Sequence, residues 1–195
     1  MQSSKITDQN LVTQYIQGNE ACLEMLINRH KDRIFTTIIL IVKDSYIAED
    51  LFQETFIKII KNLKKGKYNE EGKFLPWAIR IARNMAIDYF RKMKRMPNVT
   101  RSDGEDVFRK IKLAVDNREE QMIRHEKESM VRAVINKLPE EQRQVLILRH
   151  YGDLSFKEIA AMTGVSINTA LGRMRSALNN MRKLMEHTSL NTASQ

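Results

Sequence analysis

The sequence is poor in the residues that build disulfide scaffolds, metal clusters and membrane spans. Its 195 residues include a single cysteine, Cys22, which excludes an internal disulfide and any site built from several cysteines. The longest uninterrupted apolar run is residues 38–42, far short of the roughly 20 residues that a membrane-spanning helix needs. No signal-peptide pattern opens the sequence. We therefore expect a cytoplasmic protein whose cysteine stays reduced in the core.

Helix-breaking residues are also scarce. The chain has three prolines and seven glycines, and most of them stand where a helix should begin or end. Apolar residues recur with helical spacing in four segments of the first half, which are residues 8–17, 20–43, 45–63 and 74–95. The sequence predicts an all-α protein of two small helical domains, the first at residues 8–96 and the second at 119–187. A flexible linker is expected at residues 97–118.

Signatures of catalysis are missing as well. The four histidines, His30, His125, His150 and His187, are scattered without paired metal-ligand spacing, and we expect each to line a surface or an interface. The sequence contains no glycine-rich phosphate loop and no nucleophile motif. We therefore predict no catalytic residue, metal site, cofactor or small-molecule substrate, and a protein that is not an enzyme.

Positive charge is abundant but local. The formal net charge of +9 and an isoelectric point near 9.7 suggest a polyanionic partner. Residues 58–95 hold twelve Lys or Arg against three acidic residues, so this segment alone carries a charge equal to the whole excess. A solvated lysine-rich face would have the same composition, and the arrangement of the charges has to distinguish the two interpretations.

The predicted helix at residues 74–95 separates its residues onto two arcs. The apolar arc contains Phe74, Ala78, Ala82, Met85, Ala86, Tyr89 and Met93. The polar arc contains Arg80, Arg83, Asn84, Asp88, Arg91, Lys94 and Arg95. Charge patterned in this way is typical of a binding face rather than of a random solvated surface. Trp77 falls within the polar arc, where it either faces a partner or packs against a neighbouring helix.

The predicted helix at residues 45–63 carries an acidic side on an otherwise basic molecule. Its apolar side contains Ile47, Leu51, Thr55, Ile59 and Leu63, and its other side contains Glu49, Asp50, Gln53 and Glu54. An acidic patch of this kind is not explained by solubility alone. The simpler interpretation is that negative charge near a helix N-terminus stabilises the helix.

Residues 154–178 predict two short helices joined by a tight corner. Ser155 and Glu158 form a capping box, Gly164 suits the left-handed end of that helix, and Ser166 caps the next one. This spacing is typical of a helix-turn-helix, although a helical hairpin in a core would also fit. A final helix is expected from residue 166 to about 185. Its inward side is predicted to contain Ile167, Ala170, Met174, Ala177, Leu178, Met181 and Leu184.

The outward side of that final helix suits a DNA groove. It contains Asn168, Thr169, Gly172, Arg173, Arg175, Ser176 and Asn179. A glycine in mid-helix costs about 1 kcal/mol relative to alanine. Close approach of the backbone to a partner would justify Gly172, and simple tolerance is the alternative.

Three separated stretches together resemble one known family. They are "AEDLFQETFIKI", "FLPWAIRIARNMAIDYFRKMKR" and "LPEEQRQVLILRHYGDLSFKEIAAMTGVSINTALGRMR". Their order and spacing resemble the extracytoplasmic-function (ECF) group of the sigma-seventy family, the promoter-specificity subunits of bacterial RNA polymerase. The resemblance implies a minimal member that keeps only the second and fourth sigma domains. It also implies three partners: core RNA polymerase, promoter DNA and a possible anti-sigma factor that holds the protein inactive.

The resemblance assigns roles to residues. The acidic side, Glu49, Asp50, Gln53 and Glu54, would bind core polymerase. The minus-ten element would contact Lys67, Tyr68, Asn69, Trp77, Arg80, Arg83, Asn84, Asp88, Arg91, Lys94 and Arg95. The minus-thirty-five element would contact Lys157, Ser166, Asn168, Thr169, Gly172, Arg173, Arg175 and Ser176, with Lys157 and Arg173 on phosphates.

The sequence departs from the family in the final helix. A typical member has a basic residue at the position of Leu171, a serine at that of Gly172 and often another basic residue at that of Ser176. Leu171 also lies at the apolar edge, so it either packs or contacts DNA. Two other functions are open from sequence alone: a stand-alone helix-turn-helix regulator with residues 8–95 as a sensing or dimerising domain, and a non-specific nucleic-acid binder.

Overall fold

The computed structural model describes residues 6–69, 72–95 and 129–192, with side chains up to residue 186. Every regular element in these ranges is an α-helix, and the chain divides into two compact units. The predicted fold class, all-α with two helical domains, is therefore confirmed. The predicted linker at 97–118 and the expected start of the second domain at 119 lie outside the described residues.

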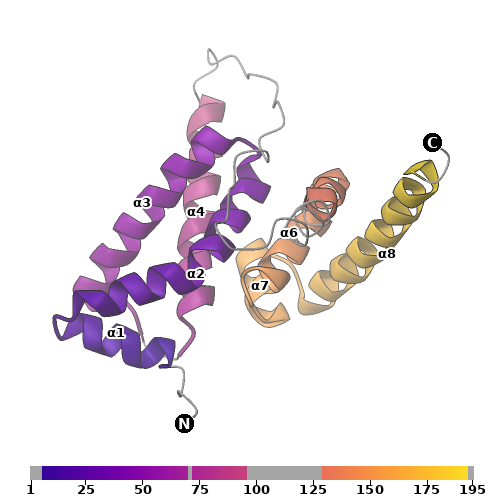
Figure 1. Ribbon diagram of the computed structural model, residues 1–195. Helices are drawn as coiled ribbons and strands as arrows, with labels where there is room; N and C mark the ends of the chain where they lie inside the picture. Colours follow the sequence, from indigo (N-terminus) through magenta and orange to yellow (C-terminus); the bar gives the residue numbers. More distant parts are fainter. Residues whose placement is uncertain (1–5, 70–71, 96–128, 193–195) are drawn as a thin grey trace, which may run out of the picture. The chain divides into compact units, whose positions relative to one another are not determined.

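The N-terminal unit is built from four helices. They are α1 (Asp8–Ile16), α2 (Glu20–Val42), α3 (Ser45–Lys64) and α4 (Phe74–Arg95). The helix α2 packs against each of the other three, and α3 also packs against α4 (Figure 1). The fully buried side chains of the core include Leu11, Leu26, Ile34, Ile38, Ile59 and Ile79. Each such side chain contributes roughly 1.5–3 kcal/mol by leaving water.

The helix boundaries of this unit follow its capping residues. Thr7 and Asp44 accept hydrogen bonds from the backbone N–H groups of Asn10 and Ile47, at 3.3 and 3.1 Å, and so start α1 and α3. Asn19 stands at the predicted start of α2, yet its side chain accepts no capping bond there. The same helix ends at Lys43, a non-glycine residue in the left-handed conformation with φ 60°.

Cys22 lies inside this unit, as predicted. Its side chain is buried, and its thiol donates to Oε1 of Gln14 at a distance of 3.2 Å. The contact joins α2 to α1, so the cysteine serves as a small core residue.

The C-terminal unit contains a helix at residues 129–137, followed by α6 (Glu140–His150), α7 (Phe156–Thr163) and α8 (Ile167–Thr192). The helix α6 packs against α7 and α8, and α7 packs against α8 (Figure 1). The core of this unit includes Val134, Leu138, Val145, Leu148, Ile159, Ala170 and Ala177. Asn180 also donates to Gln142 Oε1 at 2.8 Å, which fixes α8 on α6.

The predicted corner between α7 and α8 is present. Ser155 and Glu158 form the complete capping box, with the Ser155 N–H donating to Glu158 Oε2 at 2.9 Å and the Glu158 N–H donating to Ser155 Oγ at 3.3 Å. Gly164 ends α7 in the left-handed conformation, with φ 70°. Ser166 Oγ accepts from the Thr169 N–H at 3.0 Å and so caps α8. Ala160 and Ala170 are both small and buried, which allows the two helices to pack closely. Together with the short turn, this arrangement is a helix-turn-helix.

The expected inward side of α8 is partly wrong. Ala170 and Ala177 are buried, but Ile167 and Leu178 are exposed. On a helical projection these two residues lie together at one edge of the apolar stripe, so the neighbouring helices cover a narrower arc than the pattern suggests.

Candidate binding surfaces

The acidic side of α3 is a surface of the N-terminal unit. Glu49, Asp50, Gln53 and Glu54 are all exposed, and we call this set the acidic face. The opposite side of the helix contributes Ala48, Leu51, Thr55 and Ile59 to the core. Thr55, which has a hydroxyl within this apolar side, donates to the Leu51 carbonyl at 2.6 Å. The core therefore fixes the orientation in which α3 presents its carboxylates.

The two-arc pattern of α4 is present for most of its length. Ala78, Ile79, Ala82 and Ala86 are buried, whereas Asn84, Asp88, Arg91, Lys94 and Arg95 are exposed. We call this exposed set the basic face. Arg80 is half-buried. Within the basic face, Arg91 and Asp88 form an ion pair of 3.4 Å at the surface, an interaction that typically contributes no more than about 1 kcal/mol.

Arg83 departs from this pattern. It was placed on the polar arc, but only 8% of its surface is exposed. Loss of hydration, with a smaller contribution from the positive charge of Arg91, lowers the pKa of its guanidinium. The physical reason is its place on the helix, because Arg83 projects at the edge of the polar arc next to the buried Ile79.

The loop before α4 is held by an aromatic cluster. Lys67 and Asn69 are exposed, but Tyr68 between them is only 8% exposed. The Tyr68 ring lies 4.7 Å from that of Trp77 and 6.2 Å from that of Phe74, measured between centroids. Trp77 is half-buried and also packs against Phe74, at 5.9 Å. Of the two interpretations of Trp77, packing is the one observed, although its partner is the loop rather than a neighbouring helix.

The outward side of α8 is largely neutral. Asn168, Thr169, Gly172, Arg175 and Ser176 are exposed, and we call this set the recognition face. Lys157 on α7 and Ser166 are exposed too, and Ser166 Oγ lies 2.8 Å from Thr169 Oγ1. Leu171 is 44% exposed, so it is not part of the core of the unit.

Gly172 has open space around it. A β-carbon built at this position would meet no atom within 4 Å among the described residues. Internal packing therefore does not require glycine here, which leaves close approach of a partner or simple tolerance.

Arg173 is held by a residue that the sequence analysis missed. Its guanidinium Nη2 lies 2.7 Å from Glu141 Oε2, with 22% of the Arg173 side chain and 69% of the Glu141 side chain exposed. The pair joins α8 to the first turn of α6. No periodicity within either helix signals it, because the two residues are far apart in the sequence.

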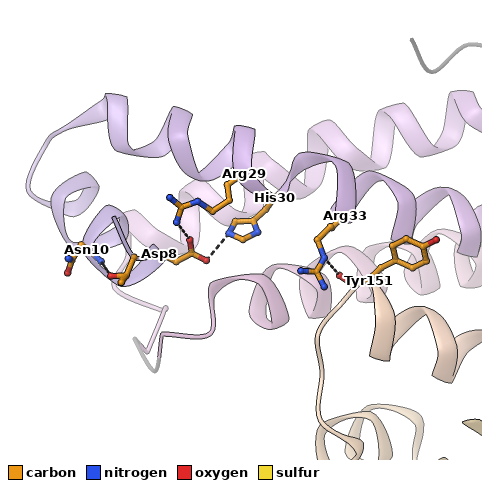
Figure 2. Close-up of polar contacts among 7 residues, drawn as sticks. Asp8, Asn10, Arg29, His30, Arg33 and Tyr151 are labelled. Atoms are coloured by element: carbon orange, nitrogen blue, oxygen red, sulfur yellow. Dashed lines mark hydrogen bonds and ion pairs between the residues drawn. The ribbon is translucent and has the colours of Figure 1, made fainter. Parts of the chain in front are cut away.

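A second polar cluster that the sequence did not indicate joins α1 to α2. Asp8 Oδ2 lies 2.7 Å from His30 Nε2, and Arg29 donates to Asp8 Oδ1 at 2.5 Å (Figure 2). Burial of Asp8 opposes ionisation, but the hydrogen bonds from His30 and Arg29 hold the pKa of its carboxyl below the ordinary value. Of the histidines expected to line a surface or an interface, His30 is instead buried in the core of the unit, and its ring centroid lies 5.4 Å from that of Phe74.

The described ranges contain neither a metal-binding cluster nor a membrane-spanning helix. Among the residues that the structure describes, no group of three or more His, Cys, Asp or Glu side chains is placed to hold a metal ion. None of the described helices is both long and apolar enough to cross a membrane.

Comparison with known proteins matches both units. Residues 26–96 match the family model of sigma-70 region 2, and residues 128–181 match that of sigma-70 region 4. The chain is 30% identical over 183 residues to the RNA polymerase sigma-H factor of Pseudomonas aeruginosa, covering 92% of this chain and 94% of that protein. It is 28% identical over 190 residues to the ECF RNA polymerase sigma-E factor of Haemophilus influenzae, covering 95% and 96%.

A solved structure has the same fold. The sigma factor RpoE of Bartonella quintana, crystallised in complex with the anti-sigma factor NepR, superposes with a TM-score of 0.62 at 19% identity. The match covers 84% of this chain and 96% of the other.

Proposed function

Because the chain belongs to the ECF group of the sigma-70 family of RNA polymerase sigma factors, we propose that its three exposed surfaces divide the work of promoter recognition. Residues 8–96 act as sigma domain 2 and residues 119–187 as sigma domain 4. The observation that carries this proposal is that the acidic face, the basic face and the recognition face are each exposed on a helix whose other side is fixed in a core.

The acidic face binds core RNA polymerase. Its four side chains lie within two turns of α3, and all four are exposed. A surface with this charge favours a basic partner and repels the phosphates of DNA. Polymerase docking therefore keeps α3 off the DNA and leaves the basic face of α4 available for it.

The basic face and its preceding loop open the minus-ten element. Arg80, Arg91, Lys94 and Arg95 hold phosphates, which gives affinity without sequence information. Extruding a base from the stack costs a few kcal/mol. Contacts from Lys67, Asn69, Asn84 and Asp88 to an exposed base edge offset that cost, and an aromatic platform adds about 1–3 kcal/mol per stacked base.

The buried residues of this region support that surface. Tyr68 and Trp77 pack on each other, so Trp77 offers the partly exposed ring and Tyr68 fixes the loop that carries Lys67 and Asn69. Arg83, which is largely buried, acts on the position of α4 rather than directly on a phosphate. Tyr68, Trp77 and Arg83 therefore all belong to the proposed minus-ten surface, and Tyr68 and Arg83 support it from the interior.

The recognition face contacts the minus-thirty-five duplex. Asn168, Thr169, Arg175 and Ser176 point to base edges or backbone, Gly172 allows the helix to approach closely, and Lys157 contacts a phosphate. Ser166 caps the helix and bonds Thr169. Arg173 is paired with Glu141, so it reaches a phosphate only by sharing its guanidinium with that carboxylate.

Three further properties follow from the family. We expect the protein to act in the cytoplasm, where bacterial RNA polymerase meets the chromosome, and to carry out no catalysis of its own. We also expect an anti-sigma factor to regulate the protein, since the structurally similar RpoE was crystallised with one. Membership of the family favours this function over a stand-alone regulator, which leaves the acidic face and the basic face without a role, and over a non-specific nucleic-acid binder.

Run-off transcription with core RNA polymerase on genomic promoter fragments tests the proposal. The unaltered chain should direct specific initiation, and Asp50→Lys or Glu54→Lys should abolish it by repelling the basic partner. Circular dichroism should show unchanged helix content, because both side chains are exposed. The matched control is Glu24→Lys, which reverses an exposed charge on α2 and should transcribe normally. Normal transcription by the Asp50 and Glu54 variants would contradict the docking assignment.

A further inference from the structure

Two large apolar side chains remain exposed on α3. Tyr46 is 74% exposed and Ile57 is 51% exposed. Isolated exposed apolar residues are common and need no explanation. These two are distinguished by their position, because they lie on the same side of the helix as the acidic face.

The helical period places the two residues in line with the middle of the acidic face. At about 100° per residue, Tyr46, Asp50, Gln53 and Ile57 project within an arc of about 60°. Tyr46 precedes the acidic face and Ile57 follows it. The two positions are eleven residue steps apart, which corresponds to about 16 Å along the helix axis. Along this line, an apolar side chain stands at each end and one carboxylate and one amide stand between them, with Glu49 and Glu54 on either side.

Charge alone is a weak basis for a stable complex. Exposed carboxylates are screened by salt, and ion pairs that they form at a surface contribute little to the free energy of binding. They steer and orient a partner, which affects the association rate most. Long residence depends on a few desolvated apolar or aromatic contacts, and tyrosine is enriched among them.

We propose that Tyr46 and Ile57 are the apolar anchors of the core-polymerase interface, one at each end of the acidic face. The inference rests on the proposed docking of the acidic face. It assigns the partner a basic surface flanked by two apolar contact sites about 16 Å apart. The carboxylates determine the association rate and the anchors determine the dissociation rate.

Binding kinetics with immobilised core RNA polymerase test this assignment. The variants Tyr46→Ser and Ile57→Ser should each weaken binding at least about five-fold. The change should appear in the dissociation rate, with an unaltered dependence of the association rate on salt. The matched control is Ile16→Ser on α1, where the isoleucine is 55% exposed, and this variant should bind within about two-fold of the unaltered chain.

A charge variant distinguishes failure of the two anchors from failure of the proposed docking of the acidic face. Asp50→Lys should lower the association rate and flatten its salt dependence. If Asp50→Lys loses binding while both serine variants bind like the unaltered chain, the assignment of the anchors is wrong and the docking of the acidic face is supported. If Asp50→Lys binds normally, the acidic face does not bind core polymerase, and the assignment of the anchors is wrong as well. Thermal unfolding of each variant confirms that the fold is intact.

Discussion

The basic face of α4 and the recognition face of α8 use positive charge in different ways. On α4, Lys94 and Arg95 are exposed next to Arg91, whose ion pair with Asp88 is long and at the surface. On α8, Arg173 is largely covered and lies 2.7 Å from Glu141. The first surface offers mobile charge to a phosphate chain, whereas the second offers short neutral side chains and an open stretch of backbone.

This difference has a consequence for how each surface recognises DNA. Separated strands present phosphates and unstacked bases without a regular groove, so charge and stacking suit them. An intact duplex presents a major groove of fixed shape, which a helix with little bulk can enter. The N-terminal unit should therefore bind in a strongly salt-dependent way, and the C-terminal unit should depend more on shape.

Among the changes that test this difference between α4 and α8, the largest effect is expected from removing charge on α4. The double variant Lys94→Gln with Arg95→Gln should weaken promoter binding of the polymerase complex about ten-fold or more and lower the slope of log K against log salt by about 1 to 2. Fluorescence anisotropy over a salt series measures both quantities. A double variant at exposed residues elsewhere, Lys31→Gln with Lys137→Gln, should leave the slope unchanged. Equal slopes for the two double variants would show that the charges on α4 do not contact phosphates more than charges elsewhere on the surface.

A smaller effect is expected on α8, where one substitution should raise stability and weaken DNA binding. Gly172→Ala should raise the stability of the C-terminal unit by up to about 1 kcal/mol, because alanine favours the helix and the added methyl group has room. The same change should weaken binding to minus-thirty-five duplex several-fold if the backbone approaches DNA there. Thermal unfolding and competition binding give the two readouts. Unchanged DNA binding in the more stable variant would show that glycine is merely tolerated.

The smallest effect is expected at the contact between α1 and α2. Because its partners lower the pKa of Asp8 in the folded state, its stabilising contribution is present above the ordinary carboxyl pKa of about 3.9 and is lost as pH falls through the folded value. Asp8→Asn should therefore lower stability by about 1 kcal/mol or less at neutral pH. The difference from the unaltered chain should vanish in strong acid.

Denaturant unfolding at several pH values measures this difference. Asp32→Asn, which changes an exposed carboxylate on α2, is the control and should show little dependence on pH. DNA binding by the recognition face should be the same in the unaltered chain, Asp8→Asn and Asp32→Asn. A destabilisation of Asp8→Asn that persists unchanged in acid would rule out its charge as the cause.

Most of the helices could be predicted because local rules determine them. The bounds of α4 and the corner between α7 and α8 match the expectation from residue spacing and capping. The sequence also identified the exposed acidic side of α3, because Glu49 and Asp50 alternate with buried Ala48 and Leu51 at helical spacing. Periodicity is sufficient where one side of a helix faces a core.

Contacts between separated segments could not be predicted. The pair of Arg173 with Glu141, the pair of His30 with Asp8 and the packing of Tyr68 on Trp77 each join residues of different elements. Residues at the edge of an arc were also misjudged, with Arg83 buried and Leu178 exposed. At an edge, a small rotation of the helix against its neighbours decides whether water reaches the side chain.

The covered position of Cys22 makes the protein a convenient subject for site-specific labelling. Its thiol is buried and bonded to Gln14, and thiols in such surroundings react slowly with alkylating reagents. One surface cysteine introduced into each helical unit, for example at Lys31 and Lys137, would then accept a dye with little background. Energy transfer between the two dyes would report how far apart the units are held before and after the polymerase is engaged.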